Sequence, residues 1–312
     1  MSATDGDPPV PAAPPTVFVV GAGVVGTTLA TSLHGAGVPV LGLHGRPTAA
    51  AHSGSTAGAG ASVDLVATAG DLPEAVSRAD VIVVCVRDER ISQVAERLQR
   101  EARLRDHQVL LHTSGAHPAA EVLGAARSAV RAIGTLHQLV SFADPGLFAR
   151  GLRGVAFGVE GEPPARAVAR ALVGKLGGRA LDVAAAELPL YHAAAVLASN
   201  YVVALGELAR GLFVAAGVPP EDALPALVPL MSSVVQNLAR VGLPGALTGP
   251  VERGDVSTVE RHLEALDRRA PGLAPLYRSM GREVLRIALS KSPLGADVIA
   301  RLEALFGGGA PR

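Results

Sequence analysis

Hydrophobic residues follow two patterns along the chain, and the change from one to the other divides the sequence. Up to about residue 183, short apolar runs alternate with amphipathic stretches. Short apolar runs predict buried strands, and amphipathic stretches predict the helices between them. Alternation of this kind predicts an α/β domain with a doubly wound, mostly parallel sheet. The expected strands cover residues 17–20, 38–43, 81–86, 108–111, 131–136, 154–159 and 180–183, and the expected helices 71–79, 91–102, 118–130 and 163–176.

No strand pattern returns after residue 184, and long apolar, alanine-rich stretches separated by prolines take its place. They predict an all-α domain. Helices are expected over 188–216, 221–241, 255–268, 273–289 and 296–305, with Asp255 and Ser292 as N-caps of two of them. The expected organisation is a disordered tail over 1–15, an α/β domain over 16–185 and a helical domain over 186–312.

A glycine-rich turn joins the first strand to the first helix. Gly21, Gly23 and Gly26 have the G-x-G-x-x-G spacing of dinucleotide-binding turns, in the strand–turn–helix context that supports this interpretation. The first glycine permits the tight turn, the second lets the backbone approach a pyrophosphate, and the third lets the helix pack on the sheet. The helix N-terminus then binds the phosphates through its N–H groups. This turn predicts a Rossmann-type NAD(P)-binding domain over residues 16–185. The predicted cofactor site is Gly21, Ala22, Gly23, Val24, Val25 and Gly26.

The end of the second predicted strand bears on the choice of cofactor. An NAD-binding fold places Asp or Glu there for the ribose 2′-hydroxyl. This strand ends in His44, Gly45 and Arg46, and Arg46 is suited to a 2′-phosphate. NADP (as NADPH) is therefore favoured over NAD, with a solvated loop arginine as the alternative. A deazaflavin in place of the nicotinamide, or beside it, stays open.

Polar side chains follow three further strands, where ligands bind in open α/β sheets. Val86 and Asp88 follow one strand and are expected beside the cofactor, with a helix N-cap as the alternative for Asp88. Ser114 follows the next strand, beside both cofactor and substrate, and His112 before it is expected to satisfy the backbone of the turn. His137 ends the third strand as a substrate-binding residue, or else as a turn histidine.

The first helix of the second domain carries polar residues in apolar surroundings, which need partners. His192, Ser199 and Asn200 are expected on one face of this helix, toward a substrate or toward neighbouring helices. His192 is suited to donate a proton near neutral pH. Ser232 and Thr248, in polar segments farther along, complete the predicted substrate site.

Composition limits the function classes. Formal net charge is zero, which gives no indication of nucleic acid or an anionic membrane as a partner. No apolar run reaches the length of a membrane span and the N-terminus lacks a signal peptide, so a cytoplasmic protein is expected. The single cysteine, Cys85, lies in an apolar run and is expected to be buried and inert; no metal site is expected. The apolar C-terminal helices suggest a homodimer built on them.

Several segments together resemble a known family, the bacterial Rossmann-like proteins with a DUF2520 domain. The resembling segments are Gly21–Gly26, His112–Ala116, Leu136–His137 with Ser141–Pro145, Tyr191–Tyr201, and Ala246–Pro250 with Arg253–Asp255. More distantly the chain is similar to the clan of ketopantoate reductase, pyrroline-5-carboxylate reductase and 6-phosphogluconate dehydrogenase, which joins an NAD(P) domain to a helical, usually dimeric, domain. Ketopantoate reductases carry Lys, Asn and Asn where this chain has His192, Val196 and Asn200. The resemblance implies His192 as proton donor and Asn200 as the residue that orients substrate or nicotinamide.

These observations favour an NADP-dependent oxidoreductase that reduces a small 2-oxo acid, similar to ketopantoate, in a cleft between the domains. Two alternatives stay open. An imine reductase of the pyrroline-5-carboxylate type would need less acid catalysis. A nucleotide-sensing protein would bind the cofactor without turnover.

Overall fold

The computed structural model describes residues 14–45, 67–143 and 151–307. The chain forms two compact units, Met1–Ser199 and Asn200–Arg312. The sequence-based boundary at residues 185/186 falls just after the last strand, and the first unit also includes the helix that follows it. The predicted N-terminal tail and Arg46 lie outside the described residues, apart from the last two positions of the tail.

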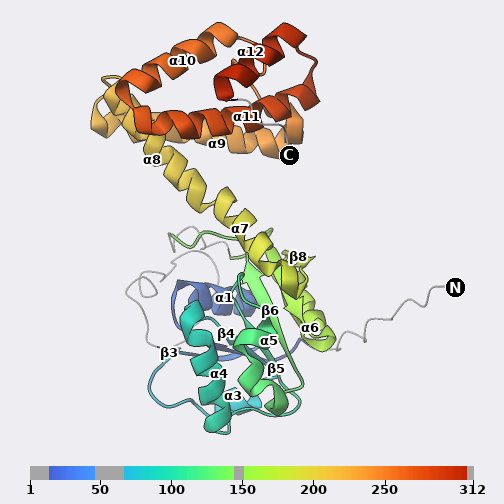
Figure 1. The fold of residues 1–312 in the computed structure, drawn as a ribbon. Coiled ribbons are helices and arrows are strands. Elements are labelled where there is room, and N and C mark those ends of the chain that lie inside the picture. The colour runs from blue at the N-terminus through green and yellow to red at the C-terminus, as the bar shows by residue number, and fades with distance from the viewer. Residues whose placement is uncertain (1–13, 46–66, 144–150, 308–312) are drawn as a thin grey trace, which may run out of the picture. The chain divides into compact units, whose positions relative to one another are not determined.

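The first unit is built on an eight-stranded sheet with the order β3-β2-β1-β4-β5-β6-β7-β8 (Figure 1). Neighbouring strands are parallel except for the antiparallel pair β6 and β7, which confirms the predicted doubly wound, mostly parallel sheet. The order reverses between β1 and β4, which is the switch point where such sheets bind ligands. The strands are β1 (Val17–Val20), β2 (Val40–His44), β3 (Ala67–Thr68), β4 (Val81–Val84), β5 (Val109–His112), β6 (Ala132–Gln138), β7 (Ala156–Gly161) and β8 (Arg179–Asp182).

Helices cover both faces of this sheet, because alternate strand residues point to opposite sides. On one face, Val19 and Val83 pack with Leu29 of α1 and Leu172 of α6. On the other face, Phe18 and Ile82 pack with residues of α3, α4 and α5. The helices are α1 (Val24–Gly35), α3 (Ala75–Arg78), α4 (Ile91–Arg100), α5 (Ala119–Val122), α6 (Pro163–Lys175) and α7 (Leu188–Ala198).

Two predicted helices of this unit are shorter than the sequence indicated. The stretch 71–79 is helical only in α3, and 118–130 divides into α5 and a 3₁₀ helix, Gly124–Ala129. Gly124, a poor helix former, begins the 3₁₀ segment directly after Leu123, whose ψ of 2° ends α5. The two-residue strand β3 has no hydrophobic run of its own and was not predicted.

The second unit is all-α, as predicted. It contains α8 (Asn200–Ala215), α9 (Pro220–Gly245), α10 (Val256–Arg269), α11 (Ala274–Lys291) and α12 (Ala296–Phe306). Its core gathers Val259, Leu263, Leu285, Leu302 and Phe306. Asp255 is the predicted N-cap and accepts a hydrogen bond from Thr258 N. The prediction for Ser292 is wrong, because Ser292 ends α11 and Gly295 precedes α12.

The long helix predicted over residues 188–216 is interrupted at Ser199. The backbone there has φ −127° and ψ −77°, which ends α7 before α8 begins. The prediction that places His192, Ser199 and Asn200 on one helical face assumes an unbroken helix, so it does not hold across this break. Ser199 instead donates its hydroxyl to Ala195 O at 2.7 Å.

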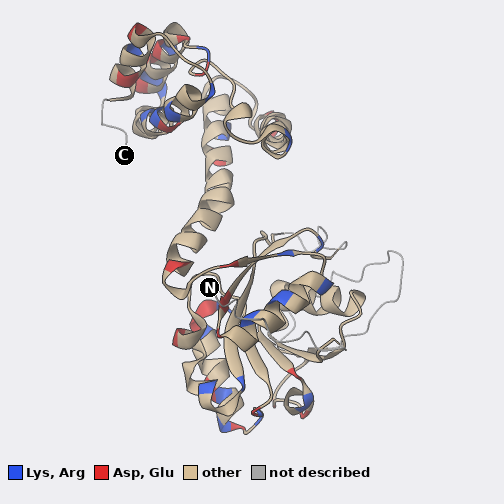
Figure 2. Ribbon diagram, turned by 90° about the vertical axis from the view of Figure 1, so that its right-hand side faces the viewer, with Lys and Arg blue, Asp and Glu red and all other residues tan. Residues whose placement is uncertain are grey.

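Helices α8 and α9 leave much apolar surface exposed. Val203, Leu230 and Val235 have exposed fractions of 74%, 60% and 64%. Figure 2 shows that most of the length of α8 carries neither acidic nor basic residues. By length and composition alone, the stretches 185–215 and 220–245 would each suffice to cross a membrane, contrary to the expectation that no apolar run is long enough. Buried helices of soluble proteins meet the same criterion, so these stretches do not establish a membrane span.

Candidate functional site

The glycine turn after β1 has the geometry that its sequence predicted. Gly21 has φ +124°, and a Cβ there would overlap the backbone carbonyl of Cys85 at the end of β4. A Cβ on Gly26 would overlap the carbonyl oxygen of Gly21, so the close approach of α1 to the turn requires glycine. Gly23, the residue before α1, would place a Cβ in open space with no atom within 4 Å. The turn therefore leaves room for a pyrophosphate at the helix N-terminus, where the first N–H groups have no partner in the helix.

The neighbouring strand β2 ends in His44, which is buried and whose Nδ1 lies 2.9 Å from the Thr68 hydroxyl. Burial lowers the pKa of His44 below its usual range. This imidazole is therefore neutral at neutral pH and supplies no positive charge for a 2′-phosphate. The positive charge predicted for that position comes from Arg46, which lies outside the described residues.

Asp88 and Ser114 meet beyond the carboxyl ends of β4 and β5. The Ser114 hydroxyl donates to Asp88 Oδ2 at 2.8 Å and accepts from Ala116 N at 3.2 Å. Asp88 begins a 3₁₀ helix, Asp88–Arg90, but makes no side-chain cap, so the N-cap alternative is not what the structure shows. His117 lies 4.0 Å from the same carboxylate oxygen. The side chains of Asp88 and His117 are partly exposed and are available to a ligand at this edge, whereas Ser114 is buried.

Beneath this edge, His112 belongs to a chain of buried hydrogen bonds. Its Nδ1 accepts from Ser114 N at 3.2 Å, and its Nε2 lies 2.9 Å from Thr135 Oγ1. Thr135 Oγ1 donates to Glu160 Oε2 at 2.8 Å, and the same oxygen accepts from Ala119 N at 2.9 Å. Because Nδ1 accepts, the proton of the neutral ring is on Nε2. Burial lowers the pKa of His112 to about 3, which confirms a structural histidine that satisfies the turn.

His137, at the end of β6, lies against the turn after β5 and against helix α7. A Cβ on Gly115 would come within 2.6 Å of the His137 ring, so glycine is required for this approach. His137 Nδ1 is 2.9 Å from the Tyr191 hydroxyl, and the two rings meet edge to face. The ring of His192 lies 6.0 Å from that of His137 between centroids. Burial lowers the pKa of His137 to about 4 and raises that of Tyr191 to about 12.

These contacts form one continuous line along the carboxyl edge of the sheet. Gly21 touches Cys85, Asp88 bonds to Ser114, Gly115 packs on His137, and His137 bonds to Tyr191 next to His192. Strands β1, β4, β5 and β6 are consecutive in the sheet, so the line crosses the switch point from the glycine turn to α7. The first unit therefore joins the glycine turn to a row of hydrogen-bond donors and acceptors at this edge.

The other predicted site residues are not part of this line. Val86 is half-buried and packs into the sheet core. Asn200, Ser232 and Thr248 are exposed and belong to the second unit. Ser199 ends the first unit and is held by Ala195.

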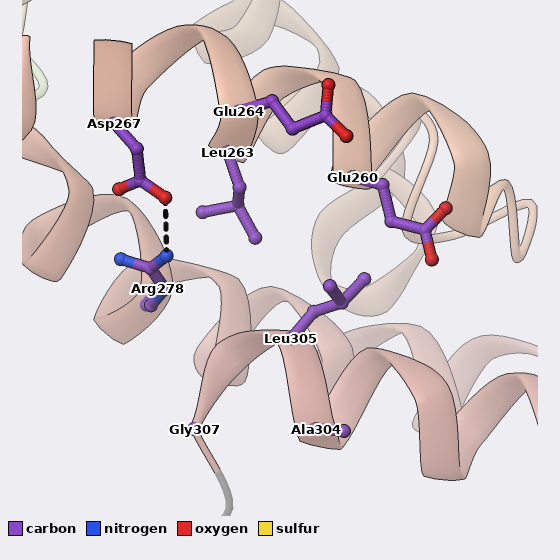
Figure 3. Close-up of a pocket in the computed structure, with 8 residues that line it drawn as sticks. All are labelled: Glu260, Leu263, Glu264, Asp267, Arg278, Ala304, Leu305 and Gly307. Atoms are coloured by element: carbon purple, nitrogen blue, oxygen red, sulfur yellow. Dashed lines mark hydrogen bonds and ion pairs between the residues drawn. The ribbon is translucent and has the colours of Figure 1, made fainter.

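The second unit has a cavity of its own, of about 390 Å³, between α10, α11 and α12 (Figure 3). Leu263 and Leu305 line it, and Glu260, Glu264 and Asp267 lie along its rim. Each of these carboxylates has an arginine partner; Arg278, for example, donates to Asp267 at 3.1 Å. Nothing in its lining provides the chemistry of the first unit.

Cys85 is buried and its pKa is raised to about 12, so the thiol is protonated and inert, as predicted. Within residues 14–45, 67–143 and 151–307, no group of His, Cys, Asp and Glu has the arrangement of a metal site.

Sequence patterns missed four participants. Gly115, His117, Thr135 and Glu160 have no motif of their own. A polar residue in the middle of a buried strand, such as Thr135 in Ala132–Gln138, was the available signal, because it needs a buried partner.

A sheet of this order, with a glycine turn at its switch point, defines an α/β dinucleotide-binding domain. Residues 16–114 match the family model of NADP oxidoreductases described as coenzyme F420-dependent, and residues 155–284 match the domain of unknown function DUF2520. The chain thus carries a DUF2520 domain behind a domain of the NADP oxidoreductase family, which confirms the resemblance. The DUF2520 match begins before β7 and includes the last two strands of the sheet.

Solved structures share this fold. Protein TM1727 from Thermotoga maritima is 22% identical, with a TM-score of 0.66 over 88% of this chain and 99% of that one. BF3122 from Bacteroides fragilis, described as a candidate NADP oxidoreductase, is 19% identical, with a TM-score of 0.63 over 88% and 98%. The imine reductase from Myxococcus stipitatus, solved with NADP+, is 21% identical, with a TM-score of 0.54 over 92% and 99%. No curated protein matches the chain.

Proposed function

We propose that this chain is an NADP-dependent oxidoreductase that reduces the carbonyl group of a small 2-oxo acid, of which ketopantoate is the model. The observation that carries the proposal is the continuous line of contacts from Gly21 to His192 along the carboxyl edge of the sheet. The match of residues 16–114 to NADP oxidoreductases supports the nucleotide.

The glycine turn fits a dinucleotide, because Gly23 leaves open space where a side chain would block a pyrophosphate. Gly21–Gly26 would hold the phosphates, Arg46 the 2′-phosphate, and Asp88 and Ser114 would border the nicotinamide end. Bound NADPH supplies a hydride to the substrate carbon. The residues of this chain then bind the substrate, orient its carbonyl and supply one proton to the developing alkoxide.

His192 is our choice for that proton. It lies on α7 next to the partly buried pair His137 and Tyr191, at the end of the line of contacts away from the glycine turn. Burial lowers the pKa of His137 and raises that of Tyr191, so both side chains are neutral near pH 7. These two residues therefore bind and position the substrate, and we assign the proton transfer to their neighbour His192. We retain Asn200 as the proposed residue that orients substrate or nicotinamide.

Imine reduction is the second candidate, and the Asp88 carboxylate is the observation that favours it. A protonated iminium carries positive charge and an N–H donor, both of which a carboxylate stabilises. The similarity in fold to the imine reductase from Myxococcus stipitatus is compatible with this alternative. A nucleotide-sensing protein without turnover is the third candidate.

We also propose that a second copy of this chain covers the exposed apolar side chains of α8 and α9. Val203, Leu230 and Val235 expose more than half of their surface, and contiguous apolar surface of this kind marks an interface. The two helices pack on each other, with Gly206 of α8 facing Met231 of α9. In the proposed homodimer, the exposed residues of both helices would form one interface.

The proposal is tested by calorimetric titration of the full chain with NADPH, NADH and a reduced deazaflavin, on wild type and on Arg46→Ala. Tight NADPH binding that weakens at least tenfold in the variant is expected, because the 2′-phosphate loses its charge partner. Turnover is then followed at 340 nm with ketopantoate, other 2-oxo acids and cyclic imines. If none of the three cofactors bound, the proposed oxidoreductase function would be excluded. Binding without turnover of any substrate would favour the nucleotide sensor.

A further inference from the structure

The geometry of the pair His137 and Tyr191 indicates how His137 would bind a substrate. His137 Nδ1 faces the Tyr191 hydroxyl at 2.9 Å, and the rings are nearly perpendicular, at 84°. The phenol itself rests on the backbone of β7, because a Cβ on Gly158 would overlap the Tyr191 hydroxyl. Gly158 is the partner of His137 across the antiparallel pair β6 and β7. Both rings are therefore held by the sheet edge and by each other.

Which nitrogen of His137 carries the proton depends on the direction of this hydrogen bond, which either group can donate. Tyr191 keeps its hydroxyl proton at every physiological pH, since burial raises its pKa to about 12. A phenol hydroxyl donates readily to an imidazole nitrogen, and Nδ1 is then the acceptor. The proton of a neutral ring must consequently be on Nε2. Within the described ranges, no hydrogen bond to Nε2 is formed, so this N–H is free to meet a ligand.

Charged and titratable groups around His137 come from three elements. They are Asp88 after β4, His112 and His117 after β5, and Tyr191 and His192 on α7. Burial and the nearby His192 outweigh Asp88 and lower the pKa of His137 to about 4. An imidazole in this environment stays neutral during turnover and acts as a hydrogen-bond donor rather than as an acid.

We propose that His137 binds the carbonyl oxygen of the substrate as a neutral imidazole, donating from Nε2, and that Tyr191 is the positioning residue that fixes this tautomer. The inference rests on the proposed function and refines it. A neutral N–H donor needs a lone pair, which a carbonyl oxygen offers and a protonated iminium nitrogen lacks. The pair therefore selects substrates with C=O over substrates with protonated C=N. His192 then delivers the proton to an oxygen already held by His137.

The test measures the tautomer directly, before any substrate is needed. The full chain is labelled with ¹⁵N-histidine, the His137 signals are assigned by their loss in His137→Gln, and the nitrogen shifts are followed from pH 8 to pH 5. We expect a neutral ring protonated on Nε2 throughout this range in wild type. Tyr191→Phe should release the ring into a mixture of both tautomers. An Nδ1–H tautomer or a charged ring in wild type would overturn the inference whether or not the variant folds.

The chain contains a matched control in its second unit. His262 Nδ1 lies 2.8 Å from the Tyr277 hydroxyl, also with perpendicular rings. Tyr277→Phe should change the signals of His262 and leave those of His137 and the catalytic constants unaltered.

A second readout uses ketopantoate with NADP+, a pair that cannot react. Its addition should shift the Nε2 signal of His137 in wild type, and an unmoved signal with both ligands shown to be bound would overturn the assignment. With NADPH, Tyr191→Phe should lower kcat/KM for a 2-oxo acid about tenfold, the equivalent of one hydrogen bond of about 1.4 kcal/mol. Failure of NADPH to bind would remove the proposed function instead, and would leave the tautomer result standing.

Discussion

Thr135 and Glu160 face each other across the antiparallel strands β6 and β7, and the threonine hydroxyl donates to the carboxylate at 2.8 Å. Both residues are buried. The bond lies between His112, on the site side, and the N-terminus of α5, where Ala119 N donates to the same carboxylate oxygen. A polar chain thus runs across β5, β6 and β7 and holds the turn that carries Ser114.

Replacement of Thr135 by valine should break this chain without changing side-chain shape. The His112 Nε2–H and the Glu160 carboxylate would each lose a partner while staying buried, which costs about 1–3 kcal/mol per group. A lower free energy of unfolding in urea is the expected result. Thr31→Val is the matched control, because Thr31 only bonds to carbonyls of its own helix. Equal stability of Thr135→Val and Thr31→Val would contradict the prediction.

The buried histidine His112 should make stability depend on pH. Its pKa is about 3 in the folded chain and near 6.5 when unfolded, so the unfolded chain binds an extra proton between these values. Its contribution is complete above pH 6.5 and is lost as the pH falls toward 3, by at most about 1.4 kcal/mol per pH unit. His137 acts in the same direction down to about pH 4. Thermal unfolding from pH 7.5 to pH 4.5 should show a falling midpoint, and His112→Gln should reduce the slope.

Two glycines of the turn should respond differently to alanine. Gly23→Ala adds a methyl group in open space at an ordinary backbone conformation, so the fold should tolerate it. Its Cβ would occupy the space proposed for the pyrophosphate, and the Kd for NADPH should rise at least tenfold. Gly26→Ala would overlap the Gly21 carbonyl oxygen and should destabilise the domain by several kcal/mol. Calorimetry and thermal unfolding of both variants separate the two effects. Unchanged NADPH affinity in Gly23→Ala would place the cofactor elsewhere.

His192→Ala should lower kcat by two or more orders of magnitude, the usual contribution of a general acid. The Kd for NADPH should change little, because His192 lies at the far end of the line of contacts from the glycine turn. Steady-state kinetics with a 2-oxo acid and calorimetry with NADPH measure the two quantities. Full turnover in the variant would exclude His192 as the proton donor and would favour imine reduction, which needs less acid catalysis.

Val203→Asp and Val235→Asp should convert the proposed dimer to a monomer, because each places a charge in the interface. Light scattering after size exclusion gives the mass, and Glu264→Gln, on the exposed face of α10, is the control. A wild-type monomer would contradict the dimer. If the wild type floated with phospholipid vesicles and both variants did not, the partner of these helices would be a membrane instead.

The sequence was most informative where a local pattern decides the structure. Apolar runs predicted the strands of the sheet other than β3, and the spacing of Gly21, Gly23 and Gly26 predicted the turn, because both depend on residues within one element. Strand β3 depends instead on pairing with β2, and its two residues carry no pattern. The break in the helix at Ser199 likewise has no proline or glycine that would predict it.

Pairs brought together from distant positions could not be predicted. Tyr191 was visible as a polar residue on an apolar helix, but its partner His137 is 54 positions away in the sequence. The link from Thr135 to Glu160 exists because β7 runs antiparallel to β6, and nothing in the strand pattern indicates that direction. Candidate residues at single strand ends were therefore within reach, whereas their connections required the fold.

The reversed direction of β7 has a consequence for how this sequence can vary. It brings Gly158, which has no side chain, to the edge where the neighbouring strands present side chains. The Tyr191 phenol occupies the space that a side chain at position 158 would fill. The two positions share one volume. Any larger residue at 158 demands a smaller one at 191, and a smaller one at 191 releases His137. The glycine, the tyrosine and the histidine can therefore vary only together.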